Sequence, residues 1–377
     1  MYLIIQFNLL LVLLCFPILL AKEKSYHIQE FDNFIYKSLN TSKISGIGIA
    51  IFSKDSVLYK KGYGFSDLKK KKRFTTNTIM NIASISKTFI GTSIMYLVEN
   101  KQINLDDDIN KLLPFHIYNP HSPESIITLR ALMSHTSGII DNQKIYLSSY
   151  HYGKDSPIKL GYFLKNYLSK DGEFYSEDNF TNKTIGKEFT YSNIGAGLAG
   201  YIVEIISGKP FNIFTKDIIF GPLGMSNTFW FLSEMDSTNH AKIYKFDSKK
   251  ILLEEIELYG LTTYPDGGLR TSINDLVEYL LYFILDDTSK DIKIISEEKI
   301  AEMFSPDYFD FYSNFWNIGE KIGHGGGDPG VSTGMFYEKE NDIGYIFFIN
   351  TSGYLKIEKF EKTIIEFGKY LKDLNVK

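Results

Sequence analysis

Cysteine is nearly absent from this 377-residue sequence, whose one cysteine is Cys15. A single thiol excludes a disulfide framework within the chain and a thiolate metal site. Arginine is also scarce, and the net charge is −4 at pH 7. Because no basic excess is available to neutralise phosphates, we expect no nucleic-acid partner. The sequence also lacks a Walker phosphate loop and a His/Glu pair at metal-ligand spacing, so we expect neither a metal ion nor a cofactor.

An uncharged and mostly apolar stretch runs from Leu3 to Ala21, directly before Lys22. It resembles a secretory signal, although no Lys or Arg precedes it and its end is a poor cleavage site. It is almost long enough to span a bilayer, so a retained membrane attachment is the alternative. We therefore expect residues 1–21 to be a signal peptide or membrane anchor. The protein would then be exported and would be periplasmic, extracellular or membrane-anchored.

Strand-like patterns stand near both ends of the chain. Small and β-branched residues alternate over Gly46–Phe52, and a second run follows over Val57–Tyr63 after a polar turn. Near the other end, Gly334–Tyr337 and Ile343–Ile349 flank the polar turn Glu340–Asp342. Runs of this kind on either side of a short polar turn are typical of β-hairpins. The sequence therefore predicts one hairpin at each end.

Apolar residues at helical spacing occur before, between and after these two hairpins. It precedes the first hairpin from Ile28 to Leu39 and follows the second from Ile357 to Leu374. Between them, Ser86–Asn100, Ala196–Ile206 and a segment from a Ser272 cap to Leu285 also read as helices. Apolar positions three and four residues apart are typical of amphipathic helices.

These elements predict an α/β (α+β) fold. An antiparallel sheet would be flanked by the N- and C-terminal helices, and an all-helical domain would be inserted into it. Within a single 22–377 domain, we expect the sheet part to cover about residues 26–85 and 255–377. The helical part would cover about 86–254. A cleft between the two parts is the natural place for a site.

Ser84 and Lys87 stand three residues apart where a loop of small residues enters the predicted helix from Ser86. Residues at this spacing share one helix face, so a neutral lysine amine could take the proton of the serine hydroxyl. The pattern is weak alone, because three other Ser-x-x-Lys copies start at Ser66, Ser156 and Ser296.

A second motif, Tyr191-Ser192-Asn193, precedes the helix at 196–206. A tyrosine beside a lysine could relay a proton to a leaving group. A turn with a half-buried tyrosine is the structural alternative. A second copy begins at Tyr312, but it lies too close to the third motif for a helical domain to intervene.

The third motif is the glycine-rich stretch from His324 to Gly330. Glycines in a strand let another backbone or a substrate approach closely, and their N–H groups could stabilise an oxyanion. Lys321 and Gly323 form a rival of similar chemistry. A shift of three residues along a strand moves a side chain to the opposite face, so only one of Lys321 and His324 can serve the site.

Together the three motifs resemble the serine β-lactamase and penicillin-binding-protein superfamily, and specifically its class C β-lactamase and esterase branch. That branch carries Ser-x-x-Lys, Tyr-x-Asn and Lys/His-x-Gly in this order. The resemblance extends over roughly Gly46 to Asn350 and implies a β-lactamase/DD-peptidase-like fold. Supporting stretches are Gly46–Gly64, Ile126–Gly138, Gly221–Met225 and Gly267–Leu269.

The resemblance implies a role for each motif residue. Ser84 would be the nucleophile, and Lys87 and Tyr191 would share the general acid and base work. Asn193 would orient the acyl side chain or Lys87. His324 would take the substrate-binding position that a lysine often holds.

Two glycines complete the implied site. Gly326 and Gly327 would border the substrate, and the backbone of Gly327 would be the second oxyanion donor beside that of Ser84. His324 is the departure that matters, because an imidazole is mostly neutral near pH 7 and holds a substrate carboxylate less firmly than an ammonium does.

We therefore expect a metal-independent serine hydrolase that acts through an acyl-enzyme on small-molecule or short-peptide substrates. Small esters and D-amino-acid peptides are favoured over β-lactams. The alternatives are a β-lactamase or penicillin-binding DD-carboxypeptidase, and, in another class, a non-catalytic relative that uses the cleft for binding or as a scaffold.

Overall fold

A central antiparallel sheet organises the computed structural model, which describes residues 24–250, 252–285, 292–352 and 355–375. The sheet has eight strands in the order β10-β11-β12-β13-β14-β1-β2-β3. The strands are β1 (Gly46–Phe52), β2 (Val57–Asp67), β3 (Lys72–Arg73), β10 (Tyr312–Ser313), β11 (Trp316–Asn317), β12 (Lys321–Asp328), β13 (Val331–Glu338) and β14 (Ile343–Ile349). Both predicted hairpins, β1–β2 and β13–β14, are confirmed.

The two hairpins meet in the middle of the sheet. β1 pairs with β14 from Ile47 opposite Ile349 to Phe52 opposite Gly344. Every residue of both strands is buried, which explains their nearly continuous apolar sequences, since both faces of the sheet are covered.

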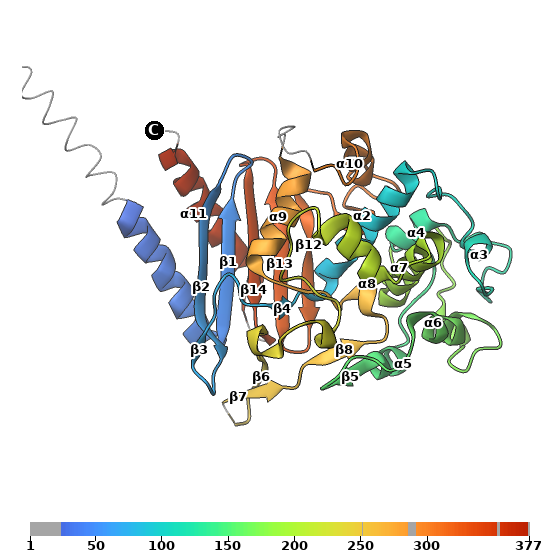
Figure 1. The fold of residues 1–377 in the computed structure, drawn as a ribbon, viewed down its shortest axis with the longest axis horizontal. Coiled ribbons are helices and arrows are strands. Elements are labelled where there is room, and N and C mark those ends of the chain that lie inside the picture. Colours follow the sequence, from blue (N-terminus) through green and yellow to red (C-terminus); the bar gives the residue numbers. More distant parts are fainter. Residues whose placement is uncertain (1–23, 251, 286–291, 353–354, 376–377) are drawn as a thin grey trace, which may run out of the picture.

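The terminal helices cover one face of the sheet (Figure 1). They are a helix over residues 24–41 and α11 (Ile357–Asn375), as predicted. The rings of Phe31 and Phe367 stack at 4.1 Å between these two helices. α9 (Ile273–Ile284) packs against β1 and β14. Ser272 caps α9 by accepting a hydrogen bond from the Asp275 N–H, as its position predicted.

The helices from the middle of the chain lie together on the β12 side of the sheet, opposite β2 and β3 (Figure 1). α2 begins at Ser86, as predicted, and packs against the longest of them, α7. They are α2 (Ser86–Glu99), α3 (Ile109–Leu112), α4 (Leu129–Met133), α5 (Gln143–Tyr146), α6 (Leu160–Leu168), α7 (Asn193–Ser207) and α8 (Phe211–Thr215), with α10 (Glu297–Met303) later in the chain.

Small groups of short strands connect the sheet and the helices. β5 and β6 lie within residues 86–254, which we expected to be all-helical, and neither was predicted, because runs of three and five residues are too short to show a clear alternation. Two of the groups are pairs, β4 (Met80–Asn81) with β9 (Arg270–Thr271) and β5 (Tyr150–Tyr152) with β8 (Tyr259–Leu261), and the third is a three-stranded sheet in which β6 (Ile243–Asp247) lies between β7 (Leu252–Ile256) and β15 (Thr351–Ser352).

The structure is thus a mixed α/β fold with an antiparallel sheet, as expected from the sequence. The division into a sheet part and a helical part stays a prediction. Across the described residues, no helix has the length and apolar character needed to cross a bilayer. Residues 1–21, the predicted signal peptide or anchor, lie outside the described residues.

Candidate active site

Ser84 sits on a tight turn, the 3₁₀ helix Ala83–Ile85, directly before α2. Ala83 has φ = 49°, a left-handed conformation that costs a residue with a Cβ about 1–3 kcal/mol. Asn81 holds this turn from both sides. Its Oδ1 accepts a hydrogen bond from the Ala83 N–H at 2.7 Å, and its Nδ2 donates one to the Gly267 carbonyl at 3.1 Å. The backbone that carries Ser84 is therefore fixed in a conformation it would not adopt alone.

Lys87 projects from the first turn of α2 and is fully buried. Its Nζ lies 3.0 Å from Ser84 Oγ. It also donates a hydrogen bond of 2.6 Å to the backbone carbonyl of Asp266, at the end of the 3₁₀ helix Tyr264–Asp266. The structure thus brings together the serine and lysine singled out in the sequence, at the distance that a proton transfer requires.

Tyr191 lies on the open side of this pair and is 38% exposed. Its ring centre is 5.0 Å from Lys87 Nζ. Asn193, the first residue of α7, lies beside it, and both border the same cavity as Ser84. The Tyr191 and Asn193 of the second motif therefore lie next to the first motif.

Asp141, which sequence reasoning missed, fixes the second motif. Its carboxylate accepts hydrogen bonds from the backbone N–H groups of Asn193 and Ile194 at 2.9 and 3.0 Å. It also accepts from Asn193 Nδ2 at 2.9 Å and from the Ser192 hydroxyl at 3.0 Å. A carboxylate at a helix N-terminus is stabilised by the helix dipole and caps unpaired N–H groups. Asn193 is therefore held in place by Asp141.

The third motif forms the last residues of β12, which runs past the Ser84 turn. A Cβ on Gly326 would lie 2.3 Å from Thr333 Oγ1 and 2.4 Å from the carbonyl oxygen of Ile82. Only glycine lets β12 approach the turn this closely. A Cβ on Gly327, by contrast, would meet nothing within 4 Å, and Gly327 borders the cavity.

His324 lies near Tyr191, with 6.4 Å between the two ring centres, but it is not among the residues that line the cavity. Its Nδ1 donates to the Gly325 carbonyl at 2.5 Å, and its Nε2 is 3.1 Å from the Tyr312 hydroxyl. Burial, together with the nearby charge of Lys87, lowers the pKa of His324 to about 4. The ring is therefore neutral at pH 7, and its two nitrogens contact protein atoms. Substrate binding by His324 stays a prediction.

The rival basic residue of β12, Lys321, serves a different part of the molecule. Its Nζ donates to Glu361 of α11 at 2.8 Å and to the Tyr345 hydroxyl at 3.0 Å. α11 packs with Tyr345 on one face of the sheet, whereas Met335, which pairs with His324, belongs to the core on the other face. The expectation that Lys321 and His324 lie on opposite faces of the strand is confirmed.

A cavity of about 270 Å³ opens beside Ser84. Several of its lining residues were given no role from the sequence. Two of them, Asp266 and Asp328, nevertheless stand beside Gly267–Leu269 and within His324–Gly330, the glycine-rich stretches noted in the sequence. Its lining residues are Ser84, Gln143, Tyr146, Leu147, Tyr150, Tyr191, Asn193, Asp266, Gly267, Gly327 and Asp328.

Two carboxyl groups in this wall have unusual electrostatics. Burial raises the pKa of Asp266 to about 7, although the charge of Lys87 opposes the shift. Burial likewise raises the pKa of Asp328 to about 6, opposed by a hydrogen bond from Tyr150. Raised pKa values of this size gather at functional sites. No group of three or more His, Cys, Asp or Glu side chains in the described ranges is arranged to hold a metal ion.

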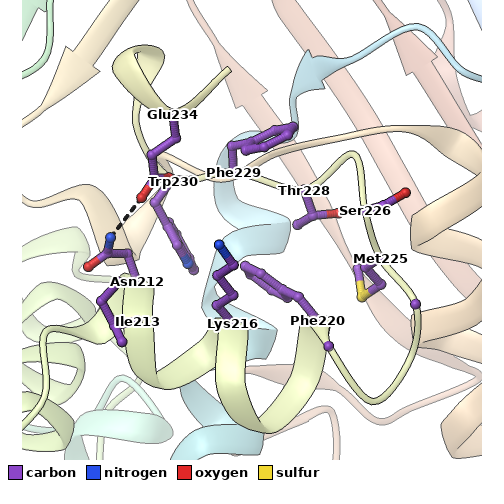
Figure 2. Close-up of a pocket in the computed structure, with 12 residues that line it drawn as sticks. Asn212, Ile213, Lys216, Phe220, Met225, Ser226, Thr228, Phe229, Trp230 and Glu234 are labelled. Atoms are coloured by element: carbon purple, nitrogen blue, oxygen red, sulfur yellow. Dashed lines mark hydrogen bonds between the residues drawn. The ribbon is translucent and has the colours of Figure 1, made fainter. Parts of the chain in front are cut away.

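A larger cavity of about 440 Å³ lies beside α8 (Figure 2). Lys216, Phe220 and Trp230 line it, and Asn212 donates a hydrogen bond of 2.7 Å to Glu234 at its edge. None of the residues of the three motifs borders it. The candidate chemistry therefore belongs to the smaller cavity at Ser84.

Comparisons with known proteins agree with this arrangement. The Beta-lactamase family model matches residues 31–366. Protein flp of Staphylococcus aureus (strain MRSA252) is 25% identical over 350 residues, which cover 91% of this chain and 67% of that protein. The octameric penicillin-binding protein homologue from Pyrococcus abyssi is 28% identical, with a TM-score of 0.69 over 87% of this chain and 74% of that one.

A third relative shows the fold alone. D-amino acid amidase from Ochrobactrum anthropi SV3, solved in complex with L-phenylalanine amide, has a TM-score of 0.69 at 22% identity. The match covers 93% of this chain and 98% of that chain. The resemblance inferred from the three motifs is confirmed by the family match over most of the sequence. The chain belongs to the Beta-lactamase family.

Proposed function

We propose that the protein is a serine hydrolase that forms an acyl-enzyme on ester or amide bonds, including those of D-amino-acid peptides. The observation that carries this proposal is the 3.0 Å distance between Lys87 Nζ and Ser84 Oγ, at the wall of an open cavity. A serine hydroxyl is a weak nucleophile unless a neighbouring base takes its proton. Lys87 is that base when its amine is neutral.

The lysine is positioned for this exchange by its second contact. One amine hydrogen is donated to the Asp266 carbonyl, which leaves the lone pair of a neutral amine free to face Ser84 Oγ. As the hydroxyl proton moves to Lys87, Ser84 Oγ bonds to the substrate carbonyl carbon. The backbone N–H groups of Ser84 and Gly327 stabilise the resulting oxyanion.

Tyr191 completes the cycle. With its ring 5.0 Å from Lys87 Nζ, it passes a proton to the leaving alcohol or amine as the carbon–oxygen or carbon–nitrogen bond breaks. A water molecule then attacks the acyl-enzyme, its proton returns through the same pair, and the acid leaves with Ser84 restored.

The charge of the cavity favours esters and small amides over β-lactams. Among the described residues that line it, the carboxyl groups are those of Asp266 and Asp328, and no lining residue is Lys, Arg or His. When Asp266 and Asp328 are ionised, a carboxylate beside the cleaved bond would be repelled, whether in a β-lactam or at the C-terminus of a peptide, so esters and amides without that carboxylate are favoured. The neutral His324 lies outside this lining and adds no compensating charge.

Labelling of the nucleophile tests the proposal. The intact protein and its Ser84→Ala variant would be treated with a fluorophosphonate and with a fluorescent penicillin. We expect fluorophosphonate labelling of the wild-type protein and none of the variant. Equal behaviour of the two proteins would reject the enzyme in favour of a non-catalytic relative.

A substrate panel then separates the activities. It would contain p-nitrophenyl esters, a D-Ala-D-Ala peptide and nitrocefin. We expect hydrolysis of the esters to exceed that of nitrocefin. Rapid turnover of nitrocefin, together with penicillin labelling, would establish the β-lactamase alternative instead.

We also propose that the chain is exported, on the basis of the uncharged stretch from Leu3 to Ala21. Fractionation of cells that express the full chain or a chain lacking residues 1–21 tests this. The full chain should leave the cytoplasm and the shortened chain should stay in it.

A further inference from the structure

We propose that the carboxylates of Asp266 and Asp328 form a cation subsite beside Ser84, which binds the free amino group of an aminoacyl ester or amide. This inference rests on the proposed hydrolase function and names the class of acyl group that the enzyme accepts. It also gives a role to two acidic side chains that the acyl-transfer steps do not use.

Asp328 brings a carboxylate to the Ser84 turn. The Tyr150 hydroxyl donates a hydrogen bond of 2.6 Å to Asp328 Oδ1. The other oxygen, Oδ2, lies 3.9 Å from the position of a Cβ on Gly267, which is itself 3.8 Å from the carbonyl carbon of Ala83. Gly267 thus separates the Asp328 carboxylate from the backbone that carries Ser84, and Oδ2 is less than 8 Å from the Ala83 carbonyl carbon.

Asp266 contributes a carboxylate oxygen without a partner. The side chain is 1% exposed, and its Oδ1 accepts a hydrogen bond of 3.2 Å from the Tyr146 hydroxyl. Its Oδ2 is buried and has no donor within ordinary hydrogen-bond geometry, and the nearby Thr263 hydroxyl, itself without such a partner, lowers the pKa of Asp266. Leaving a buried charged acceptor unpaired is expensive, which is unusual in a folded protein unless a ligand completes it.

A positive charge beside Asp266 and Asp328 would stabilise the ionised forms of both carboxyl groups. Burial raises the pKa of both carboxyl groups, and the charge of Asp328 raises that of Asp266 further. The charge of Lys87 opposes both shifts, and that of the buried Arg270 opposes the shift of Asp328. Lys87 donates to Ser84 Oγ and to the Asp266 backbone, and Arg270 donates to backbone carbonyls, rather than to either carboxylate. An ammonium group that enters the cavity would supply the missing contacts.

The shape of the cavity agrees with an aminoacyl group. The amino nitrogen of an amino acid lies about 2.5 Å from its carbonyl carbon, and a carbonyl carbon poised for attack lies about 3–3.5 Å from the nucleophile. An α-amino group would thus stay within the cavity of about 270 Å³ that Asp266 and Asp328 share with Ser84. The rings of Tyr146 and Tyr150, whose centres are 5.9 Å apart, line that cavity and offer faces that attract a cation.

The opposing interpretation is that the two carboxylates only balance the charge of Lys87. In that case a free amino group on the substrate would bring no gain, because the subsite would already be satisfied. The two interpretations therefore differ in the effect of acetylating the substrate amine.

The experiment uses the full chain with D-alanine methyl ester and N-acetyl-D-alanine methyl ester, and the L-isomers in parallel. Acid release would be followed in a pH-stat at pH 7, where most of the α-amino group is protonated. We expect kcat/KM for the free amine to exceed that of the acetylated ester by about tenfold to a hundredfold. This is the range for a charge-assisted contact at a buried site. Equal values for the two esters would overturn the inference.

Variants locate the effect. Asp328→Asn should lower the ratio of the two kcat/KM values by about tenfold or more, whereas Asp217→Asn, which removes a surface carboxylate in the helical turn that follows α8, should leave the ratio unchanged. An unchanged ratio in Asp328→Asn would contradict the subsite.

A binding measurement covers the case in which Asp328→Asn does not fold. Ethylammonium ion should inhibit hydrolysis of p-nitrophenyl acetate by the wild-type protein competitively and at least tenfold more strongly than propanol, a neutral molecule of similar size. Equal inhibition by both would count against the subsite.

The proposed function has its own readout in the same assay. Hydrolysis of p-nitrophenyl acetate that is lost in Ser84→Ala supports the hydrolase whatever the preference for amines. If neither p-nitrophenyl acetate nor any methyl ester is hydrolysed, the proposed function falls and the inference falls with it.

Discussion

The hydroxyl of Tyr312 donates a hydrogen bond to Nε2 of His324, with 3.1 Å between the two atoms. Because Nδ1 of His324 contacts the Gly325 carbonyl, which can only accept, the neutral ring carries its proton on Nδ1. Tyr312 begins the second copy of Tyr-x-Asn, which sequence reasoning set aside. It is buried against the third motif and acts on His324, not on Ser84.

Replacement of His324 by Gln should flatten the pH dependence of stability. The pKa of His324 is about 4 in the folded protein against 6.5 for an ordinary histidine, so between these values the unfolded chain binds a proton that the folded protein does not. The free energy of unfolding therefore falls as the pH is lowered from 6.5 towards 4, by about 1.4 kcal/mol per pH unit from this residue. Urea denaturation at pH 5, 6 and 7 would measure the slope.

The control for this prediction is internal. Burial also lowers the pKa of His135 and His240, and both are present in the wild-type protein and in the variant. The contribution of His240 cancels in the difference between the two slopes, whereas that of His135 does not cancel fully, because the charge of His324 helps to lower the pKa of His135. Identical slopes in the two proteins would show that His324 titrates normally.

Lys87→Met should lower ester hydrolysis by about 10²–10⁴-fold, because it removes the group that takes the Ser84 proton. Methionine fills a similar volume, but the charge of Lys87 opposes the raised pKa values of Asp266 and Asp328, and removing one member of a buried group of charges is destabilising. We therefore expect a lower midpoint of thermal unfolding, and kcat would be compared at a temperature at which the variant is folded. A loss of activity that follows only from unfolding, seen as an equal loss of folded protein by circular dichroism, would contradict this role.

Gly326→Ala should destabilise the protein by about 1–3 kcal/mol, because the new methyl group would overlap Thr333 Oγ1 and the Ile82 carbonyl. Ester hydrolysis should fall as well, since Ile82 leads directly into the Ser84 turn. Gly325→Ala is the matched control, because the nearest atom to its Cβ would be 3.8 Å away. Chemical denaturation and kcat/KM would be measured for both. Equal losses in the two variants would refute the steric explanation.

Asp141→Ala should lower the free energy of unfolding by about 1–3 kcal/mol, since it leaves Ser192 and the start of α7 without their acceptor. The loss should be accompanied by weaker hydrolysis, because Asn193 and Tyr191 would no longer be held beside Lys87. Asp178→Ala, at an exposed carboxylate, serves as the control. Unaltered kinetics in a folded Asp141→Ala protein would show that the position of Asn193 does not matter.

Much of the fold follows from local patterns in the sequence. The β1–β2 and β13–β14 hairpins and the helix α11 were predictable because their apolar residues repeat at the period of a strand or a helix. The Ser84–Lys87 pair was also selected correctly as neighbours, because order along the chain separated it from its copies. One of those copies, at Ser296, instead caps α10 by accepting a hydrogen bond from the Lys299 N–H.

The rest of the site depends on contacts that no local pattern encodes. The carboxylate of Asp328 meets Tyr150, 178 residues earlier in the chain, and Asp266 meets Tyr146 across 120 residues. No sequence pattern around either aspartate predicts its tyrosine partner. Their burial, and hence their raised pKa values, arises only when β12, α5 and the Tyr264–Asp266 turn pack around one cavity.

The pairing of β1 with β14 has a consequence for the time at which activity can arise. These strands join the two ends of the chain, and the backbone N–H of Ser45 donates to Thr351, 306 residues away. A chain growing from its N-terminus exposes Ser84 early, but β12 and β14 are made near the end of synthesis. The oxyanion donor and the wall of the cavity are then still missing. On the proposed mechanism a nascent or truncated chain would be inert, and Ser84 would gain its reactivity only when synthesis is essentially complete.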